Sequence, residues 1–138
     1  KTLERKQKNK GTSGTLDGVA LALPALMRSE KLIKRVKRAG YELAQPEYLL
    51  ERFQDKLEQN HSLVKDKDQD LQNENWIGEL FFMLNLLAVH LGVDTEKALR
   101  NTNRKFENEV INFEKYGTNE QIQFFSTKLF NFLFKKKN

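Results

Sequence analysis

Residues Asn75–Phe106 read NWIGELFFMLNLLAVHLGVDTEKALRNTNRKF. Between Ile77 and Leu91 the apolar side chains recur at intervals of three and four residues, the spacing of one face of an α-helix. The apolar surface extends almost around the helix through three further residues, Phe82, Met83 and Leu86. A helix of this kind is usually buried on most sides, so we expect it in a bundle centre or an oligomer interface. Gly92 ends it, and Asp94 or Thr95 caps the next helix.

Two helices are also predicted before this stretch. The first begins near Val19 or Leu23, with Pro24 in its first turns, and ends at Gly40. The second begins at Pro46 and fades through residues 60–62. The strongly polar residues 65–75 are expected to form a loop or frayed helix ends. Because no run alternates apolar and polar residues as a strand does, the predicted fold class is all-α.

Composition places limits on what this chain of 138 residues can be. It contains no Cys, which excludes disulfides and thiol chemistry. It has no run of about 18 apolar residues and no apolar segment after the basic N-terminus, so neither a membrane span nor a secretory signal is expected. We therefore expect a cytoplasmic location, or an organellar stroma or matrix. The net charge of +5 is uneven, because residues 1–40 alone carry a net charge of +8.

Three segments are expected along the chain. Residues 1–17 are polar and basic and read as an arm or an interdomain linker, residues 18–116 as one helical domain, and residues 117–138 as a terminal helix. The terminal segment holds five of the ten Phe before Lys135–Lys137. It either completes the core or an interface, or docks on a partner or a lipid surface. We favour the first alternative, because so small a domain needs apolar area.

Three blocks of this sequence, in order, resemble the MazG-type nucleoside triphosphate pyrophosphohydrolases. They are TLDGVALALPALMRSEKL at residues 15–32, AGYEL at 39–43 and GELFFMLNLLAVHLGVDTEKALRNTNRKFE at 78–107. The resemblance implies a helical bundle of four or five helices that assembles into a homodimer or larger unit. The arm at 1–14 is similar to the linker between the two MazG-like domains of full-length members. That likeness identifies the chain as a C-terminal MazG-like domain.

The resemblance also implies an activity that this chain is poorly equipped to perform. Family members convert nucleoside triphosphates to monophosphates and pyrophosphate with Mg²⁺, held by an E-x-x-E pair on one helix and an E-x-x-D pair on the next. Carried over by position, these four ligands fall on Lys56, Gln59, Trp76 and Glu79. Only Glu79 keeps a carboxylate, and the neighbouring Asp55 is a residual candidate ligand.

The phosphate-binding K-F-x-x-R element of the family is also altered. It keeps Lys105, but Glu109 replaces its Arg. Two pairs of nearby carboxylates are alternative ligands at helical spacing, Asp55 with Glu58 and Glu51 with Asp55. Ordinary surface carboxylates are the simpler account of both pairs.

Three functions remain open from the sequence. The first is a domain that has lost catalysis and serves assembly or regulation of an attached or partner enzyme. The second is a weakly active hydrolase that uses Glu79, Asp55 and Mg²⁺. The third is a binding module that holds nucleotide or nucleic acid through basic residues of the first helix, including Arg28 and Lys31, although a solvated face is the commoner role of such residues. If the protein is inactive, no cofactor is expected.

Other chemistry finds little support. The two histidines are far apart, and His90, at the end of the central helix, is expected to cap or pack rather than catalyse. The glycines of GTSGTLDG at residues 11–18 lack the Gly-Lys-Ser/Thr ending of a phosphate-binding loop. Trp76 is expected to fill the former metal pocket.

Overall fold

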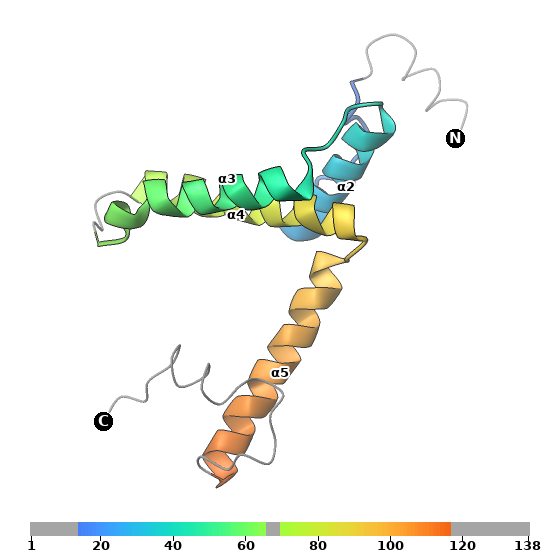
Figure 1. The fold of residues 1–138 in the computed structure, drawn as a ribbon. Coiled ribbons are helices and arrows are strands. Elements are labelled where there is room, and N and C mark those ends of the chain that lie inside the picture. The colour runs from blue at the N-terminus through green and yellow to red at the C-terminus, as the bar shows by residue number, and fades with distance from the viewer. Residues whose placement is uncertain (1–13, 66–69, 117–138) are drawn as a thin grey trace. The chain divides into compact units, whose positions relative to one another are not determined.

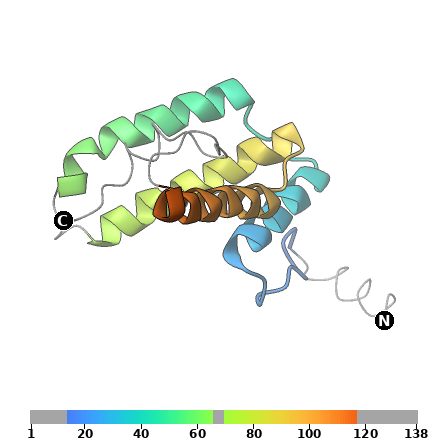
Figure 2. The ribbon, with the colours of Figure 1, turned by 90° about the horizontal axis from the view of Figure 1, so that it is seen from below.

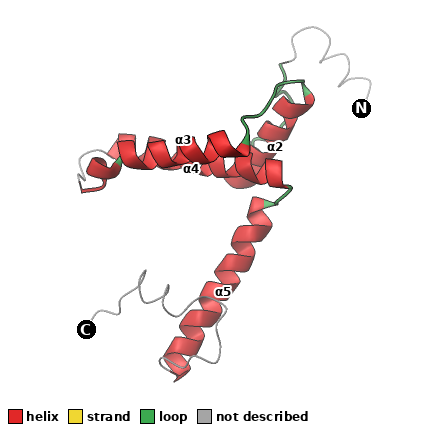
Figure 3. Ribbon diagram, in the orientation of Figure 1, coloured by secondary structure: helices red, strands yellow, loops and turns green. Residues whose placement is uncertain are grey.

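The computed structural model describes residues 14–65 and 70–116, and every regular element in these residues is helical. In chain order these are α2 (Ala25–Arg38), α3 (Pro46–Gln59), the short 3₁₀ helix η1 (His61–Lys65), α4 (Asp70–Leu91) and α5 (Thr95–Tyr116) (Figures 1 and 3). The all-α prediction is confirmed. The predicted terminal helix at 117–138 and most of the predicted arm at 1–17 lie outside the described residues.

The chain divides into two compact units, one ending at Thr95 and one beginning at Glu96. In the first unit, both α2 and α3 pack against α4. Helices α3 and α4 lie side by side and run in opposite directions, as an antiparallel hairpin (Figures 1 and 2). The candidate functional site lies on this hairpin.

Glycine ends two helices by the same hydrogen-bonding motif. Gly40 and Gly92 have φ of +99° and +69°, a left-handed conformation that a Cβ atom disfavours. After α4, the N–H of Gly92 donates to the Val89 carbonyl and that of Val93 donates to the Ala88 carbonyl. This is the Schellman pattern, and Gly40 ends α2 in the same way. The predicted ends of both helices are therefore confirmed.

Both prolines lie at helix starts, but only α3 begins where the sequence predicts it. The predicted start near Val19 or Leu23 is wrong, because α2 begins at Ala25 and the residue before a proline disfavours the helical conformation. Pro24 precedes the first residue of α2 with an extended conformation, and Pro46 is the first residue of α3. A proline fits the first turn because its missing N–H has no helical partner there. At the other end of α3, the Asn60 side chain donates a 2.7 Å hydrogen bond to the Lys56 carbonyl and satisfies one of the last backbone acceptors.

Residues 65–75 were expected to form a loop or frayed helix ends, and the loop alternative is wrong over residues 70–75, which form the first turns of α4. This segment has a single large apolar residue, Leu71, and its side chain is 71% exposed. A helical turn without a buried apolar face shows no apolar periodicity in the sequence. Periodicity therefore could not predict the start of α4.

The small core of the first unit consists of Val19, Ile33, Leu49 and Ala88. Part of α4 remains outside it, because Ile77, Phe81 and Leu84 are 43%, 51% and 45% exposed, although Ala88, one turn after Leu84 on the same face, is buried. The expectation that α4 is buried on most sides is therefore not met by the described residues of the first unit. The alternative expectation, burial in an oligomer interface, stays a prediction.

All but the first residue of α5 belongs to the second unit. As predicted, Glu96 lies in the first turn of α5, where a carboxylate interacts favourably with the helix dipole. Glu109 is buried, with 4% of its surface exposed. In the described ranges, no single helix has both the length and the apolar character of a membrane span.

Candidate functional site

The hairpin of α3 and α4 brings together two of the four positions that correspond to family metal ligands. The Lys56 ammonium near the end of α3 forms an ion pair with Oε2 of Glu79 on α4. The Lys56 side chain is 22% exposed and that of Glu79 is 54% exposed. Of the four positions, only Glu79 keeps a carboxylate. The positive charge beside that carboxylate comes from Lys56.

A cavity of about 240 Å³ adjoins this ion pair. It is lined by two cationic residues, one carboxylate and two apolar side chains: Arg52, Lys56, Glu79, Phe82 and Met83. Arg52 lies one helical turn before Lys56, while Phe82 and Met83 lie one turn after Glu79. These side chains share helix faces with the ion pair because residues three or four apart are neighbours on a helix.

Asp55, the second residual candidate ligand, is engaged elsewhere. Its carboxylate lies 3.7 Å from a guanidinium nitrogen of Arg52, three residues earlier on the same helix. Both side chains are about half exposed, and ion pairs of this kind contribute about 0–1 kcal/mol. Asp55 does not line the cavity, so nothing described joins its carboxylate to that of Glu79.

Trp76 and Gln59 complete the set of four positions. The Trp76 indole N–H donates a 2.9 Å hydrogen bond to Oδ1 of Asn73, on its own helix. Trp76 is not among the residues that line the cavity beside Lys56 and Glu79, and its expected place in the former metal pocket stays a prediction. Gln59 is the last residue of α3; it is exposed and does not line the cavity either.

These side chains do not fit a Mg²⁺ ion. Magnesium requires near-octahedral coordination by hard oxygen ligands, usually one or two carboxylates with water and phosphate. Here the Glu79 carboxylate faces an ammonium group, and the Asp55 carboxylate pairs with a guanidinium. Residues 14–65 and 70–116 contain no cluster of three or more His, Cys, Asp or Glu side chains placed to hold a metal ion.

The basic residues of α2 have partners that the sequence did not reveal. Nε of Arg28 donates to the Ala20 carbonyl at 3.2 Å, and a guanidinium nitrogen of Arg35 donates to the Asp17 carbonyl at 2.6 Å. Both arginines thus tie the segment before α2 to the helix.

Two other lysines were predicted to bind substrate. Lys31 is exposed on α2, and Lys105 is exposed on α5 in the second unit. A substrate-binding role for Arg28, Lys31 and Lys105 stays a prediction.

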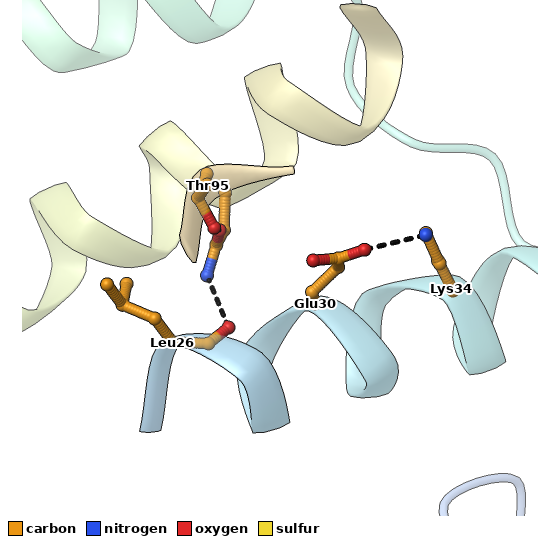
Figure 4. Close-up of polar contacts among 5 residues, drawn as sticks. Leu26, Glu30, Lys34 and Thr95 are labelled. Atoms are coloured by element: carbon orange, nitrogen blue, oxygen red, sulfur yellow. Dashed lines mark hydrogen bonds and ion pairs between the residues drawn. The ribbon is translucent and has the colours of Figure 1, made fainter. Parts of the chain in front are cut away.

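Two polar contacts hold the elements around the hairpin. The Asn85 side chain, 1% exposed, donates to the Leu26 carbonyl at 3.2 Å and accepts a 2.6 Å hydrogen bond from the Thr95 hydroxyl (Figure 4). It therefore links α4 to α2 and to the first residue of α5. Nε2 of His90 contacts the Ala44 carbonyl in the segment before α3, which agrees with the predicted packing role of this histidine.

Glu30, one turn after Leu26 on α2, forms an ion pair with Lys34 (Figure 4). Its nitrogen–oxygen distance is 2.6 Å, and the two residues are four apart on the helix. This pairing engages a further basic residue of α2 within the helix itself.

Comparison with known proteins supplies relatives for most of the chain. A nucleoside triphosphate pyrophosphohydrolase of Escherichia coli (strain K12) is 32% identical over 108 residues, as is the protein of that name in Escherichia coli O157:H7. A Thermotoga maritima protein named nucleoside triphosphate pyrophosphohydrolase/pyrophosphatase MazG is 26% identical over 104 residues. These alignments cover 78%, 78% and 75% of this chain, but only 40%, 40% and 39% of the relatives. No protein-family model matches the sequence.

Proposed function

Because this chain is MazG-like over most of its length, we propose that it is a MazG-type pyrophosphohydrolase domain that has lost catalysis. In this proposal an internal ion pair has replaced the metal centre. The domain serves the assembly or regulation of an attached or partner enzyme. Its relatives are named as nucleoside triphosphate pyrophosphohydrolases, and the chain spans about two fifths of their length.

The observation that carries this proposal is the Lys56–Glu79 ion pair. A Mg²⁺ ion at Glu79 would lie beside the Lys56 ammonium, and two cations at such a distance repel each other. The ammonium already neutralises the carboxylate, so a metal ion has to displace it before it can bind. Lys56 is also the less exposed partner, which reduces screening by solvent.

A role in assembly is supported by the exposed part of one α4 face, from Ile77 to Leu84. Ile77, Phe81 and Leu84 follow the i, i+4, i+7 spacing of a single helix face and are 43–51% exposed. Gly78 lies next to this face, and an added Cβ at Gly78 meets nothing within 4 Å. We propose that a second copy of the chain covers this face in a homodimer. A location in the cytoplasm or an organellar stroma or matrix is part of the same proposal.

The decisive experiment measures pyrophosphate release and metal binding by the same protein. The parent chain is incubated with a mixture of nucleoside triphosphates and Mg²⁺ or Mn²⁺, and its melting temperature is followed as the metal is titrated. We expect no turnover and no metal-dependent rise in melting temperature. Turnover that Glu79→Gln abolishes would show instead that the domain is an active hydrolase.

A gain-of-binding variant sharpens this experiment. Lys56→Glu places a second carboxylate beside Glu79, and a divalent ion then relieves their mutual repulsion. We expect the melting temperature of this variant to rise with Mn²⁺ concentration, as binding to the folded state requires. Lys37→Glu, the same charge change at an exposed position on α2, is the matched control and should show no such rise.

A further inference from the structure

The cavity between α3 and α4 has features that loss of a metal site does not require. It measures about 240 Å³ and is lined by Arg52, Lys56, Glu79, Phe82 and Met83. We propose that it binds a phosphate group, or a small oxyanion of the same kind, without a metal ion. Lys56 and Arg52 are the hydrogen-bond donors. This inference rests on the proposed function in one respect, namely that the Lys56 ammonium replaces the positive charge of the metal ion that the family binds at this place.

The charges that line the cavity favour an anion. Two cationic side chains face one carboxylate, so the lining carries a net positive charge. An ammonium group has three N–H donors, and Lys56 has one carboxylate partner in Glu79. Hydrogen bonds from a charged donor to an anionic oxygen are about twice as strong as neutral ones. Lys56 can therefore contact Glu79 and an anion at the same time.

Arg52 is held loosely enough to turn toward a ligand. Its ion-pair partner among the described residues is Asp55, at 3.7 Å, which is too long for a hydrogen bond. Both side chains are nearly half exposed, so breaking this pair costs about 1 kcal/mol or less. A guanidinium group offers paired N–H donors whose geometry matches two oxygens of a phosphate.

The volume of the cavity favours a small ligand. Sites for drug-sized molecules have volumes of about 300–1,000 Å³, so a cavity of about 240 Å³ favours a small anion such as phosphate. Phe82 and Met83 form the apolar part of the lining, and Phe82 is 44% exposed.

Glu79 opposes the ligand, and this gives the proposal a distinctive signature. Its carboxylate competes with the anion for the Lys56 ammonium and repels it directly. Removing the charge of Glu79 should therefore improve anion binding, whereas the same change in a metal site would abolish ligand binding. A variant that gains affinity also cannot be explained by misfolding.

The test titrates inorganic phosphate into the intact chain in EDTA at fixed ionic strength and follows binding by calorimetry and amide chemical shifts. We expect Lys56→Gln and Arg52→Gln each to weaken binding by about tenfold, the effect of one charge-assisted hydrogen bond. Glu79→Gln should tighten it. Lys37→Gln removes the same charge from an exposed site outside the cavity and should bind as the parent does. A parallel titration with a nucleoside monophosphate tells a free phosphate from a nucleotide phosphate, because only the latter gains affinity from its nucleoside.

Other results of the same titrations would contradict the phosphate site. The assignment is wrong if neither ligand binds saturably, or if Lys56→Gln and Arg52→Gln bind as Lys37→Gln does. Such a failure leaves the loss of catalysis untouched, because EDTA removes every metal ion from the titration. Conversely, metal-dependent turnover by the parent would overturn the proposed function and leave the phosphate result standing.

Discussion

Asn85 provides the sharpest test of how the hairpin is held to its neighbours. Its side chain is 1% exposed and makes two hydrogen bonds, to the Leu26 carbonyl and to the Thr95 hydroxyl. Asn85→Ala removes both, at about 1 kcal/mol each. It also leaves a cavity smaller than a Leu→Ala change would make. Together these losses predict a destabilisation of about 2–4 kcal/mol, which corresponds to roughly 8–16 °C in melting temperature for a domain of this size.

The measurement is urea unfolding, followed by far-UV circular dichroism and by the fluorescence of Trp76, the one tryptophan in the chain. Trp76 lies on α4, the same helix as Asn85, so its emission reports on the affected element. The control is Asn75→Ala, the same chemical change at an exposed position of α4. It should alter stability by less than about 0.7 kcal/mol, the difference in helix propensity. Equal midpoints for the two variants would refute the reasoning.

Three further predictions follow from single features. Gly92→Ala forces a Cβ into a left-handed conformation and should cost about 1 kcal/mol, whereas Gly78→Ala meets only open space within α4 and should gain about as much, as urea unfolding will show. Phe81→Glu should convert a homodimer to monomer in light scattering without loss of helicity, and a parent that is already monomeric contradicts the dimer proposal. Arg35→Gln should speed amide exchange in the segment before α2, because the bond to the Asp17 carbonyl is weakened, and unchanged exchange would show that this bond tethers nothing.

The proposed loss of catalysis and the proposed phosphate site have one physical origin. When a lysine replaces a carboxylate ligand, the pocket loses an oxygen donor and gains a fixed positive charge. The charge that a metal ion would bring to a phosphate is then part of the protein, although an ammonium does not activate water as a metal ion does. Binding a phosphate group and hydrolysing a triphosphate are therefore separable in this pocket.

Part of the candidate site was accessible from the sequence. Lys56 and Glu79 were identified through the family resemblance, but their contact depends on how α3 packs against α4. Arg52, Phe82 and Met83 were missed as lining residues. Helical spacing held a usable signal for all three, because each lies three or four residues from a member of the ion pair.

Local chemistry was enough for the sequence alone to determine the helices. Apolar periodicity, prolines in first turns and glycines at helix ends act within a few residues, so they predicted the all-α class and most helix boundaries. Tertiary structure decided which charges meet. Asp55 and Lys56 are adjacent in the chain, yet one pairs within its own helix and the other reaches Glu79 across the hairpin. Such pairing depends on the packing of two helix faces, which no local pattern encodes.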